Sequence, residues 1–102
     1  MIAVQPPKAT GMVIQVELFG IPRQRAGSAT VRIELPGEQT VLARVYQELG
    51  RRFPDLAAAC LEGSRLRPEY IVNIGGERFV SDPGAVLRSG DSLLMMSADA
   101  GG

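Results

Sequence analysis

The sequence contains no histidine, no tryptophan and a single cysteine, Cys60. Without histidine, the chain cannot form a Cys–His nucleophile of its own. One thiol and scattered carboxylates also do not make the usual ligand set of a metal site. A lone cysteine excludes an internal disulfide and fits a reducing compartment such as the cytoplasm. We therefore interpret Cys60 as a small filler of the hydrophobic core.

Charge of neither sign is in excess, because eleven Lys and Arg residues balance eleven Asp and Glu residues. These cations are dispersed along the chain, and Lys8 is the only lysine. A phosphate-binding surface needs clustered positive charge, so nucleic acid is not an expected partner. No apolar run is long enough to cross a bilayer, and residues 1–11 lack the apolar stretch of a signal peptide. We therefore expect neither membrane insertion nor secretion.

Two half-buried strands are predicted near the start of the chain. Apolar and polar residues alternate over 12–18 and again over 31–35, which is the period of a strand with one buried face. The polar stretch 23–28 between them predicts a loop, so the two strands should form an antiparallel hairpin. Residues 1–11 contain two adjacent prolines and are expected to be a flexible leader.

A helical period follows this hairpin. Apolar residues at helical spacing predict a main helix over residues 41–53, with Thr40 as its N-cap and Pro54 as its end. Asp55 is expected to cap a shorter helical turn after that proline. Residues 62–68 are polar and predict a loop.

Three further strands are predicted in the second half of the chain, over residues 70–74, 79–80 and 92–97. The two glycines at 75–76 predict a tight turn with positive φ. Asp91 is expected to hydrogen-bond the backbone of its own turn rather than to act as an acid or base.

This order of elements predicts an α+β fold of the ubiquitin-like β-grasp type, with a mixed sheet of four to five strands and one main helix on one face. The last strand is apolar on both faces, so we expect it at the centre of the sheet, parallel to the first strand. The other face of the sheet is left for solvent or for a partner. The domain is expected to span residues 12–96, between a leader (1–11) and a flexible tail (97–102).

Two adjacent methionines, Met95 and Met96, lie in this last strand. Adjacent side chains of a strand point to opposite faces, so one methionine should pack against the helix and the other should face the open side of the sheet. Methionine adapts well to a partner surface. Both residues are therefore candidates for partner docking.

The sequence ends in Gly101 and Gly102. Glycine has no Cβ, so it can pass through a narrow channel and leaves the terminal acyl carbon unhindered. Such an end suits a chain whose terminus enters the active site of another protein. The alternative is a frayed end without a function.

The chain carries several short signatures in a fixed order, from a strand that ends in Phe19-Gly20 to the Gly-Gly end. They are Phe19-Gly20, an arginine-containing loop to Ala26-Gly27, Thr40-Val41, Val72-Asn73 before a glycine turn, Leu87, Gly90-Asp91 and Gly101-Gly102. This pattern resembles the MoaD/ThiS-type ubiquitin-like sulfur carriers, which include the small subunit of molybdopterin synthase. The resemblance covers about residues 12–102.

The resemblance implies a cytoplasmic carrier protein rather than an enzyme, with no cofactor bound by the chain itself. A ubiquitin-activating-like adenylyltransferase would use ATP to adenylate the carboxylate of Gly102, and a sulfur donor protein would supply the sulfur of a thiocarboxylate. A sulfur-accepting enzyme, such as the molybdopterin synthase large subunit, would then use this sulfur in the synthesis of the molybdenum cofactor. The tail that enters the partner would consist of Ser97, Ala98, Asp99, Ala100 and Gly101.

Three alternatives stay open at this point. The tail lacks the aromatic and proline residues that molybdopterin-type tails commonly carry, so thiamine or cysteine synthesis are alternative destinations of the sulfur. The chain could instead be a ubiquitin-like modifier joined through Gly102 to lysines of target proteins, in which case polymer chains could grow only through Lys8. It could also be a binding module whose Gly-Gly end is incidental.

Overall fold

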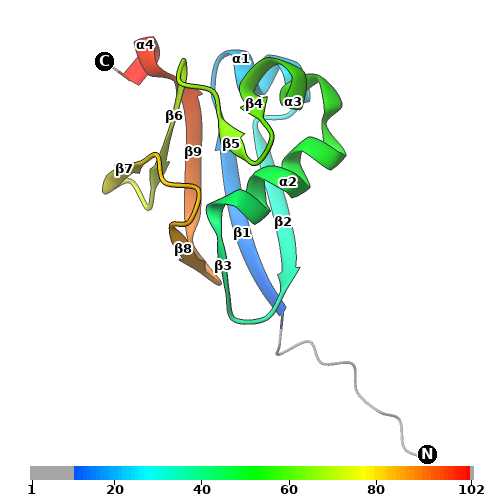
Figure 1. Cartoon of the computed structure of the whole chain (residues 1–102), viewed down its shortest axis with the longest axis vertical. Coiled ribbons are helices and arrows are strands. Elements are labelled where there is room, and N and C mark those ends of the chain that lie inside the picture. The colour runs from blue at the N-terminus through cyan, green and yellow to red at the C-terminus, as the bar shows by residue number, and fades with distance from the viewer. Residues whose placement is uncertain (1–10, 102) are drawn as a thin grey trace, which may run out of the picture.

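The computed structural model of the chain describes residues 11–101, which fold around one five-stranded mixed sheet (Figure 1). The strands of this sheet are β1 (Gly11–Leu18), β2 (Thr30–Pro36), β6 (Tyr70–Ile74), β7 (Arg78–Val80) and β9 (Ser92–Ser97). The helices are α1 (Ile21–Ala26), α2 (Leu42–Arg52), α3 (Pro54–Cys60) and α4 (Ala98–Gly101). Two short ladders pair β3 (Gln39–Val41) with β8 (Val86–Arg88), and β4 (Leu61–Glu62) with β5 (Arg65–Leu66).

The strands of the main sheet are ordered β2-β1-β9-β6-β7. β1 and β2 form the predicted antiparallel hairpin. β9 lies between β1 and β6, parallel to the first and antiparallel to the second. The predicted β-grasp arrangement, with the last strand at its centre and parallel to the first, is therefore confirmed.

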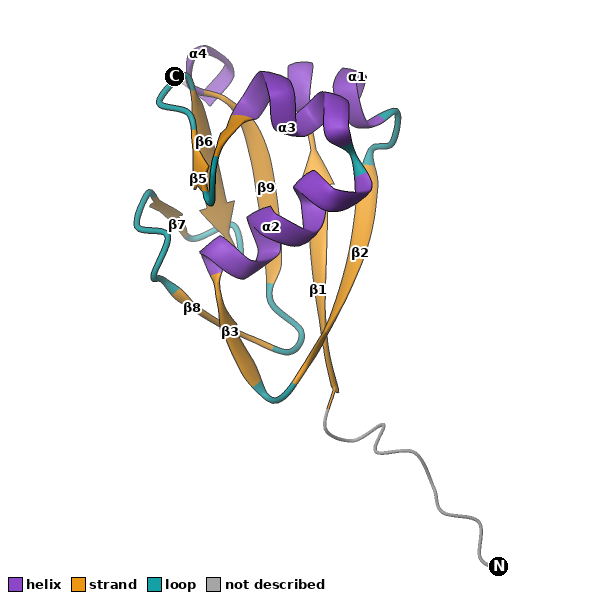
Figure 2. Ribbon diagram, turned by 45° about the vertical axis from the view of Figure 1, so that its right-hand side comes forward, coloured by secondary structure: helices purple, strands orange, loops and turns teal. Residues whose placement is uncertain are grey.

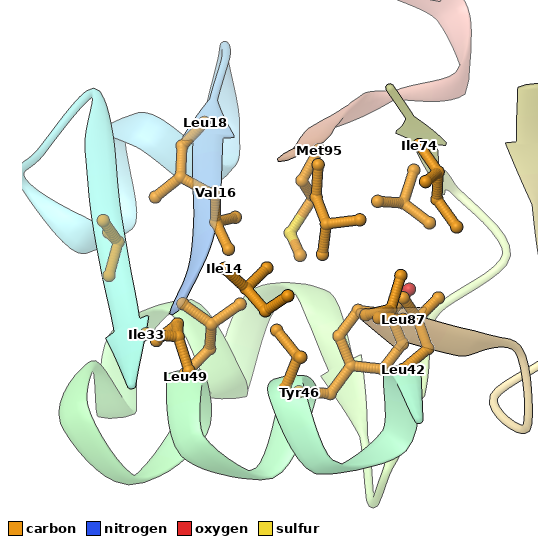
Figure 3. Close-up of a cluster of buried hydrophobic side chains, with 14 of the residues drawn as sticks. Ile14, Val16, Leu18, Ile33, Leu42, Tyr46, Leu49, Ile74, Leu87 and Met95 are labelled. Carbon is orange, nitrogen blue, oxygen red and sulfur yellow. The ribbon is translucent and has the colours of Figure 1, made fainter. Parts of the chain in front are cut away.

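The hydrophobic core lies between this sheet and α2, which crosses one face of the sheet (Figures 2 and 3). The strands and helices contribute side chains that are at most 1% exposed, among them Ile14, Val16, Ile33, Leu42, Val45, Leu49, Leu56, Leu87, Leu93 and Met95. Burying a side chain of this size contributes about 1.5–3 kcal/mol. The predicted burial of β9 on both faces is only partly correct, because Leu94 and Met96 on its other face are half-buried.

The start of α2 differs from the prediction. Thr40 lies in β3, where it pairs with Leu87 of β8, and it does not cap the helix. Val41 is the N-cap residue and makes no side-chain hydrogen bond to the helix. The predicted N-cap was wrong because pairing with a strand far along the chain outweighs a local capping preference.

The proline after α2 has two roles, of which the sequence showed one. Pro54 follows the end of α2, as predicted, and it also begins α3, because its fixed φ suits the first turn of a helix. Phe53 is therefore the N-cap of α3. Asp55, predicted as the cap, lies in the first turn instead, where its negative charge favours the N-terminal end of the helix.

Part of the segment predicted as a polar loop over residues 23–28 is the short helix α1. Pro22, which marks the end of the preceding strand, also stands in the first turn of this helix. Gly27 ends the helix in the left-handed conformation, with φ 74°. The sequence also missed β8 and the small β4–β5 hairpin, which are two or three residues long and carry no clear period.

The predicted turns are confirmed. Gly75 and Gly76 have φ values of 65° and 74°, which residues with a Cβ rarely adopt. Asp91 accepts a hydrogen bond from the backbone N–H of Arg88 at 2.8 Å, so its carboxylate holds its own turn.

The first and last strands of the sheet extend slightly beyond the predicted domain range. β1 begins at Gly11 and β9 extends to Ser97, each one residue outside the predicted range 12–96. Residues 1–10, with Lys8 among them, lie outside the described residues. The division into leader, domain and tail therefore stays a prediction.

We expect Leu49→Ala to lower the free energy of unfolding by about 2–5 kcal/mol, because Leu49 is fully buried between α2 and the sheet and the smaller side chain leaves a cavity. Urea denaturation measures this loss. Arg44→Ala, at an exposed position of the same helix, is the control and should change stability by no more than about 0.5 kcal/mol. Equal losses in the two variants would contradict the described packing.

Candidate functional site

The tail begins where β9 leaves the centre of the sheet. Ser97, the last residue of β9, pairs with Tyr70, the first residue of β6. The backbone N–H of Ala98 then donates a hydrogen bond to the carbonyl oxygen of Glu69 at 2.8 Å. Figure 1 shows α4 at this end of the sheet, directly after β9. The base of the tail is therefore held by the main-chain bonds of two neighbouring strands.

The remainder of the predicted tail forms a helical turn rather than an extended segment. α4 has four residues, Ala98–Gly101, and Asp99 in it is exposed. An isolated helix needs about 12–15 residues to be even marginally stable in water. Unwinding α4 therefore costs little free energy. Gly102, predicted to carry the acyl chemistry, lies outside the described residues.

The two methionines of β9 lie on opposite faces of the sheet. Met95 is 0% exposed and belongs to the core, whereas Met96 is half-buried on the other face. A fully buried side chain is not available to a partner. Of the two methionines that are candidates for partner docking, only Met96 is therefore accessible to a partner.

The face of the sheet opposite α2 carries an apolar patch at the end where the tail leaves. Ile71 pairs with Met96, and Phe79 and Leu94 lie on either side of Asn73. Phe19 directly follows β1, and its backbone N–H continues the ladder by donating to the carbonyl oxygen of Met95. We call the set of five apolar residues on this face the open patch: Phe19, Ile71, Phe79, Leu94 and Met96.

The open patch is bounded by polar residues on the same face. Gln15 and Glu17 of β1, and Arg32 and Glu34 of β2, alternate with core residues and are exposed. Within the patch, Phe19 is 53% and Phe79 57% exposed, which is unusual for large aromatic side chains. An exposed apolar cluster rimmed by polar residues is typical of a protein interaction site.

Asn73 lies inside the open patch, and sequence reasoning gave it no role beyond its place in the Val72-Asn73 motif. It is 8% exposed, and its side-chain oxygen has no hydrogen-bond partner among the described residues. A buried polar side chain in a strand cannot be identified from periodicity alone. Its burial depends on which strands pair with it.

A pocket of about 360 Å³ adjoins the patch at the outer edge of β6, because β7 pairs only with residues 72–74 of this strand. It is lined by Leu66, Arg67, Pro68, Tyr70, Ile71, Phe79, Val80 and Ser81. Arg67, its charged residue, already donates to the carbonyl oxygen of Ala58 at 3.4 Å and lies 4.0 Å from the carboxylate of Glu62. The Nε–H of Arg67 is buried and has no partner among the described residues, so the pocket extends the apolar surface and adds one unused hydrogen-bond donor.

Cys60 is fully buried in the core, which confirms its interpretation as a core residue. Burial raises the pKa of its thiol, and a hydrogen bond with the side chain of Tyr70 acts in the opposite direction.

Within residues 11–101, no cluster of metal-ligating side chains is present. In the same part of the chain, no helix has the length and hydropathy to cross a membrane.

The sequence matches no protein-family model and no curated protein. The fold does match solved structures. The crystal structure of small archaeal modifier protein 1 from Haloferax volcanii superposes with a TM-score of 0.72 at 23% identity, over 84% of this chain and 97% of that chain. The chain has the ubiquitin-like β-grasp fold. This is the fold that the resemblance to the MoaD/ThiS-type carriers implies.

Two further structures have the same fold. A putative molybdopterin converting factor, subunit 1, from Pyrococcus furiosus has a TM-score of 0.68 at 22% identity, over 84% of this chain and 97% of that chain. Urm1 from Trypanosoma brucei has a TM-score of 0.66 at 21% identity, over 85% and 92%. Both proteins are therefore matched over nearly their whole length.

We expect the free energy of unfolding to fall as the pH rises above about 8.5, the usual pKa of a thiol. Burial raises the pKa of Cys60 and that of Tyr46 in α2. The unfolded chain then releases these protons at a lower pH than the folded chain, so this stability is complete below the unfolded pKa and is lost as the pH rises through the folded pKa. Urea denaturation between about pH 7 and about pH 11 measures the effect.

The variants Cys60→Ala and Tyr46→Phe separate the two contributions to this pH dependence. Cys60→Ala should remove the part of the decline that begins near pH 8.5, and Tyr46→Phe the part that begins near pH 10, about the usual pKa values of the two groups. A wild-type stability that is constant over this range would contradict the described burial of both groups.

Proposed function

We propose that the chain is a sulfur carrier whose Gly102 carboxylate is adenylated by an activating enzyme and then converted into a thiocarboxylate. The observation that carries this proposal is the position of β9, the central strand of the sheet, which leads directly into the Gly-Gly tail beside the open patch. A rigid sheet thus holds the base of a short tail whose last residues carry no bulky side chain. The fold shared with a modifier protein and a molybdopterin converting factor subunit supports the same general kind of function.

The proposed reaction needs only a terminal carboxylate from this chain. A carboxylate oxygen of Gly102 attacks the α-phosphorus of ATP, pyrophosphate leaves, and the acyl carbon becomes a mixed anhydride with AMP. Hydrosulfide delivered by the donor protein then attacks this carbon, AMP leaves with the oxygen of the broken acyl C–O bond, and loss of a proton gives the thiocarboxylate. ATP is bound by the activating enzyme, whose positioning and electrostatics accelerate both steps. The chain itself is a carrier and not an enzyme.

The tail and the open patch have separate roles in this proposal. The tail, which comprises Ser97, Ala98, Asp99, Ala100, Gly101 and Gly102, enters the narrow active site after α4 unwinds. The open patch docks on the surface of the activating enzyme, and Met96 lies next to the base of the tail. Docking therefore fixes the point from which the tail extends.

Molybdenum cofactor synthesis in the cytoplasm is the proposed destination of the sulfur, with the large subunit of molybdopterin synthase as the accepting enzyme. The structural similarity to a putative molybdopterin converting factor, subunit 1, favours this destination. Thiamine or cysteine synthesis is the alternative, because the tail lacks aromatic residues and proline before its glycines.

A second candidate function is protein modification, in which Gly102 is joined to a lysine of a target protein. The similarity to structures of small archaeal modifier protein 1 and of Urm1 favours this candidate. The activation step is common to both functions, because an acyl adenylate can react with sulfur or be passed on to an amine. The final acceptor distinguishes the two.

Incubation with ATP, the activating enzyme encoded in the same genome and a sulfur donor should raise the intact mass by about 16 Da, the difference between sulfur and oxygen at an activated acyl carbon. Mass spectrometry of the whole protein measures this gain. The variant that lacks Gly102 is the control: it should show no gain and an unchanged melting temperature, because the described core does not include this residue.

Absence of the mass gain in the wild-type chain would contradict the carrier function. If covalent adducts of higher mass form in a cell extract and disappear when Gly102 is deleted, protein modification is supported. If deletion of Gly102 changes neither the mass gain nor the formation of covalent adducts, the Gly-Gly end is incidental.

We expect Met96→Glu to slow thiocarboxylate formation by about tenfold or more, because a charge placed in the open patch must lose its hydration when a partner covers it. The rate at a limiting concentration of the activating enzyme measures this effect. Gln47→Glu, at an exposed position of α2 on the other side of the molecule, adds the same charge and should leave the rate unchanged. An equal rate for the two variants would show that the open patch is not the docking surface.

A further inference from the structure

Asn73 is the one buried residue of polar type within residues 11–101. Its neighbours in β6, Val72 and Ile74, are buried in the core, so the alternation of the strand directs Asn73 to the opposite face. There it lies between Leu94 of β9 and Phe79 of β7, its direct partners across the two ladders. A polar side chain thus occupies the middle of the open patch.

The side-chain oxygen of Asn73 is shielded from solvent and has no hydrogen-bond partner in the described part of the chain. Buried polar atoms are nearly always paired, because an unpaired one loses its hydration without replacement. The two flanking side chains, Leu94 and Phe79, have no polar atom that could donate. The oxygen is therefore an acceptor that the folded chain does not use.

In the free protein, an apolar residue at position 73 would make the fold more stable than asparagine does. Leucine has the same branched side-chain skeleton as asparagine, although it is larger, has no group that needs a partner, and would extend the apolar row formed by Phe79 and Leu94. Positions where the local environment and the residue disagree are typical of functional sites. The mismatch between the polar side chain of Asn73 and its apolar surroundings points to a hydrogen-bond donor supplied by another molecule.

We propose that Asn73 determines specificity in docking: its side-chain oxygen accepts a hydrogen bond from an N–H group of the activating enzyme when that enzyme covers the open patch. This inference rests on the proposed function. The occupant it requires is an apolar protein surface with one hydrogen-bond donor near its centre. An apolar surface without this donor would bury the oxygen of Asn73 permanently unpaired and would be bound less tightly.

Phe79 lies directly opposite Asn73 in the β6–β7 ladder. It belongs to β7, an edge strand of three residues that pairs only with β6 in the main sheet, and its side chain is 57% exposed. Once the partner is bound, the surrounding side chains, Leu94 among them, exclude water from the new hydrogen bond, which strengthens it.

The test compares Asn73→Leu with the wild-type chain in two measurements. Isothermal titration with the activating enzyme from the same genome should show affinity reduced by about tenfold, because the donor of the enzyme is left unpaired. The melting temperature of the free variant should be equal to or higher than that of the wild type. Replacing a residue with a purely structural role would instead lower the melting temperature along with the affinity.

Gln15→Leu is the matched control, because it makes the same replacement of an amide by leucine at an exposed position of the same face, outside the open patch. Its affinity should equal that of the wild type. Unchanged or tighter binding by Asn73→Leu would overturn the inference, and so would a lower melting temperature, which would show that the amide is already paired in the free protein. If the wild-type chain itself does not bind the enzyme, the proposed function falls together with the inference.

Discussion

The pairing of β9 with both β1 and β6 is the constraint on which the rest of the structure depends. This strand is the last in the sequence and completes the sheet, because it lies between β1 and β6 and pairs with both. Its core face supplies Leu93 and Met95 to the cluster beneath α2. Because the ladder continues to Ser97, the position of the tail is determined by the same hydrogen bonds that close the sheet. The stability of the sheet and the placement of the base of the tail are therefore not independent in this fold.

The two faces of the sheet differ in what covers them and in the side chains they carry. One face is covered by α2 and buries aliphatic side chains almost completely, which accounts for the bulk of the favourable free energy of folding. The opposite face has a polar half along β1 and β2 and an apolar half along β6, β7 and β9. The apolar half lies beside the base of the tail. A partner that covers this half would therefore lie next to the tail.

Much of this architecture could be predicted from the sequence, because the residues concerned follow a clear period. The alternation over residues 12–18 and the helical spacing over 41–53 predicted β1 and α2, and the apolar character of 92–97 predicted the central position of β9. Thr40 was misassigned because it pairs with β8, and α1 was missed because its proline and glycine are typical of loops as well as of helix ends. The burial of Asn73 could not be predicted at all. It arises from two ladders whose partners lie at other points of the chain, and no local pattern encodes them.

The short helix α4 has a consequence for reach. Four helical residues span about 6 Å, whereas the same four residues span about 13 Å in an extended conformation. Unwinding α4 therefore advances the chain end by about 7 Å, roughly the length of two further extended residues. If the tail enters a partner as proposed, binding of its extended form would favour the unwound state of α4. Unwinding this single helical turn thus lengthens the tail while the sheet that holds its base stays unchanged.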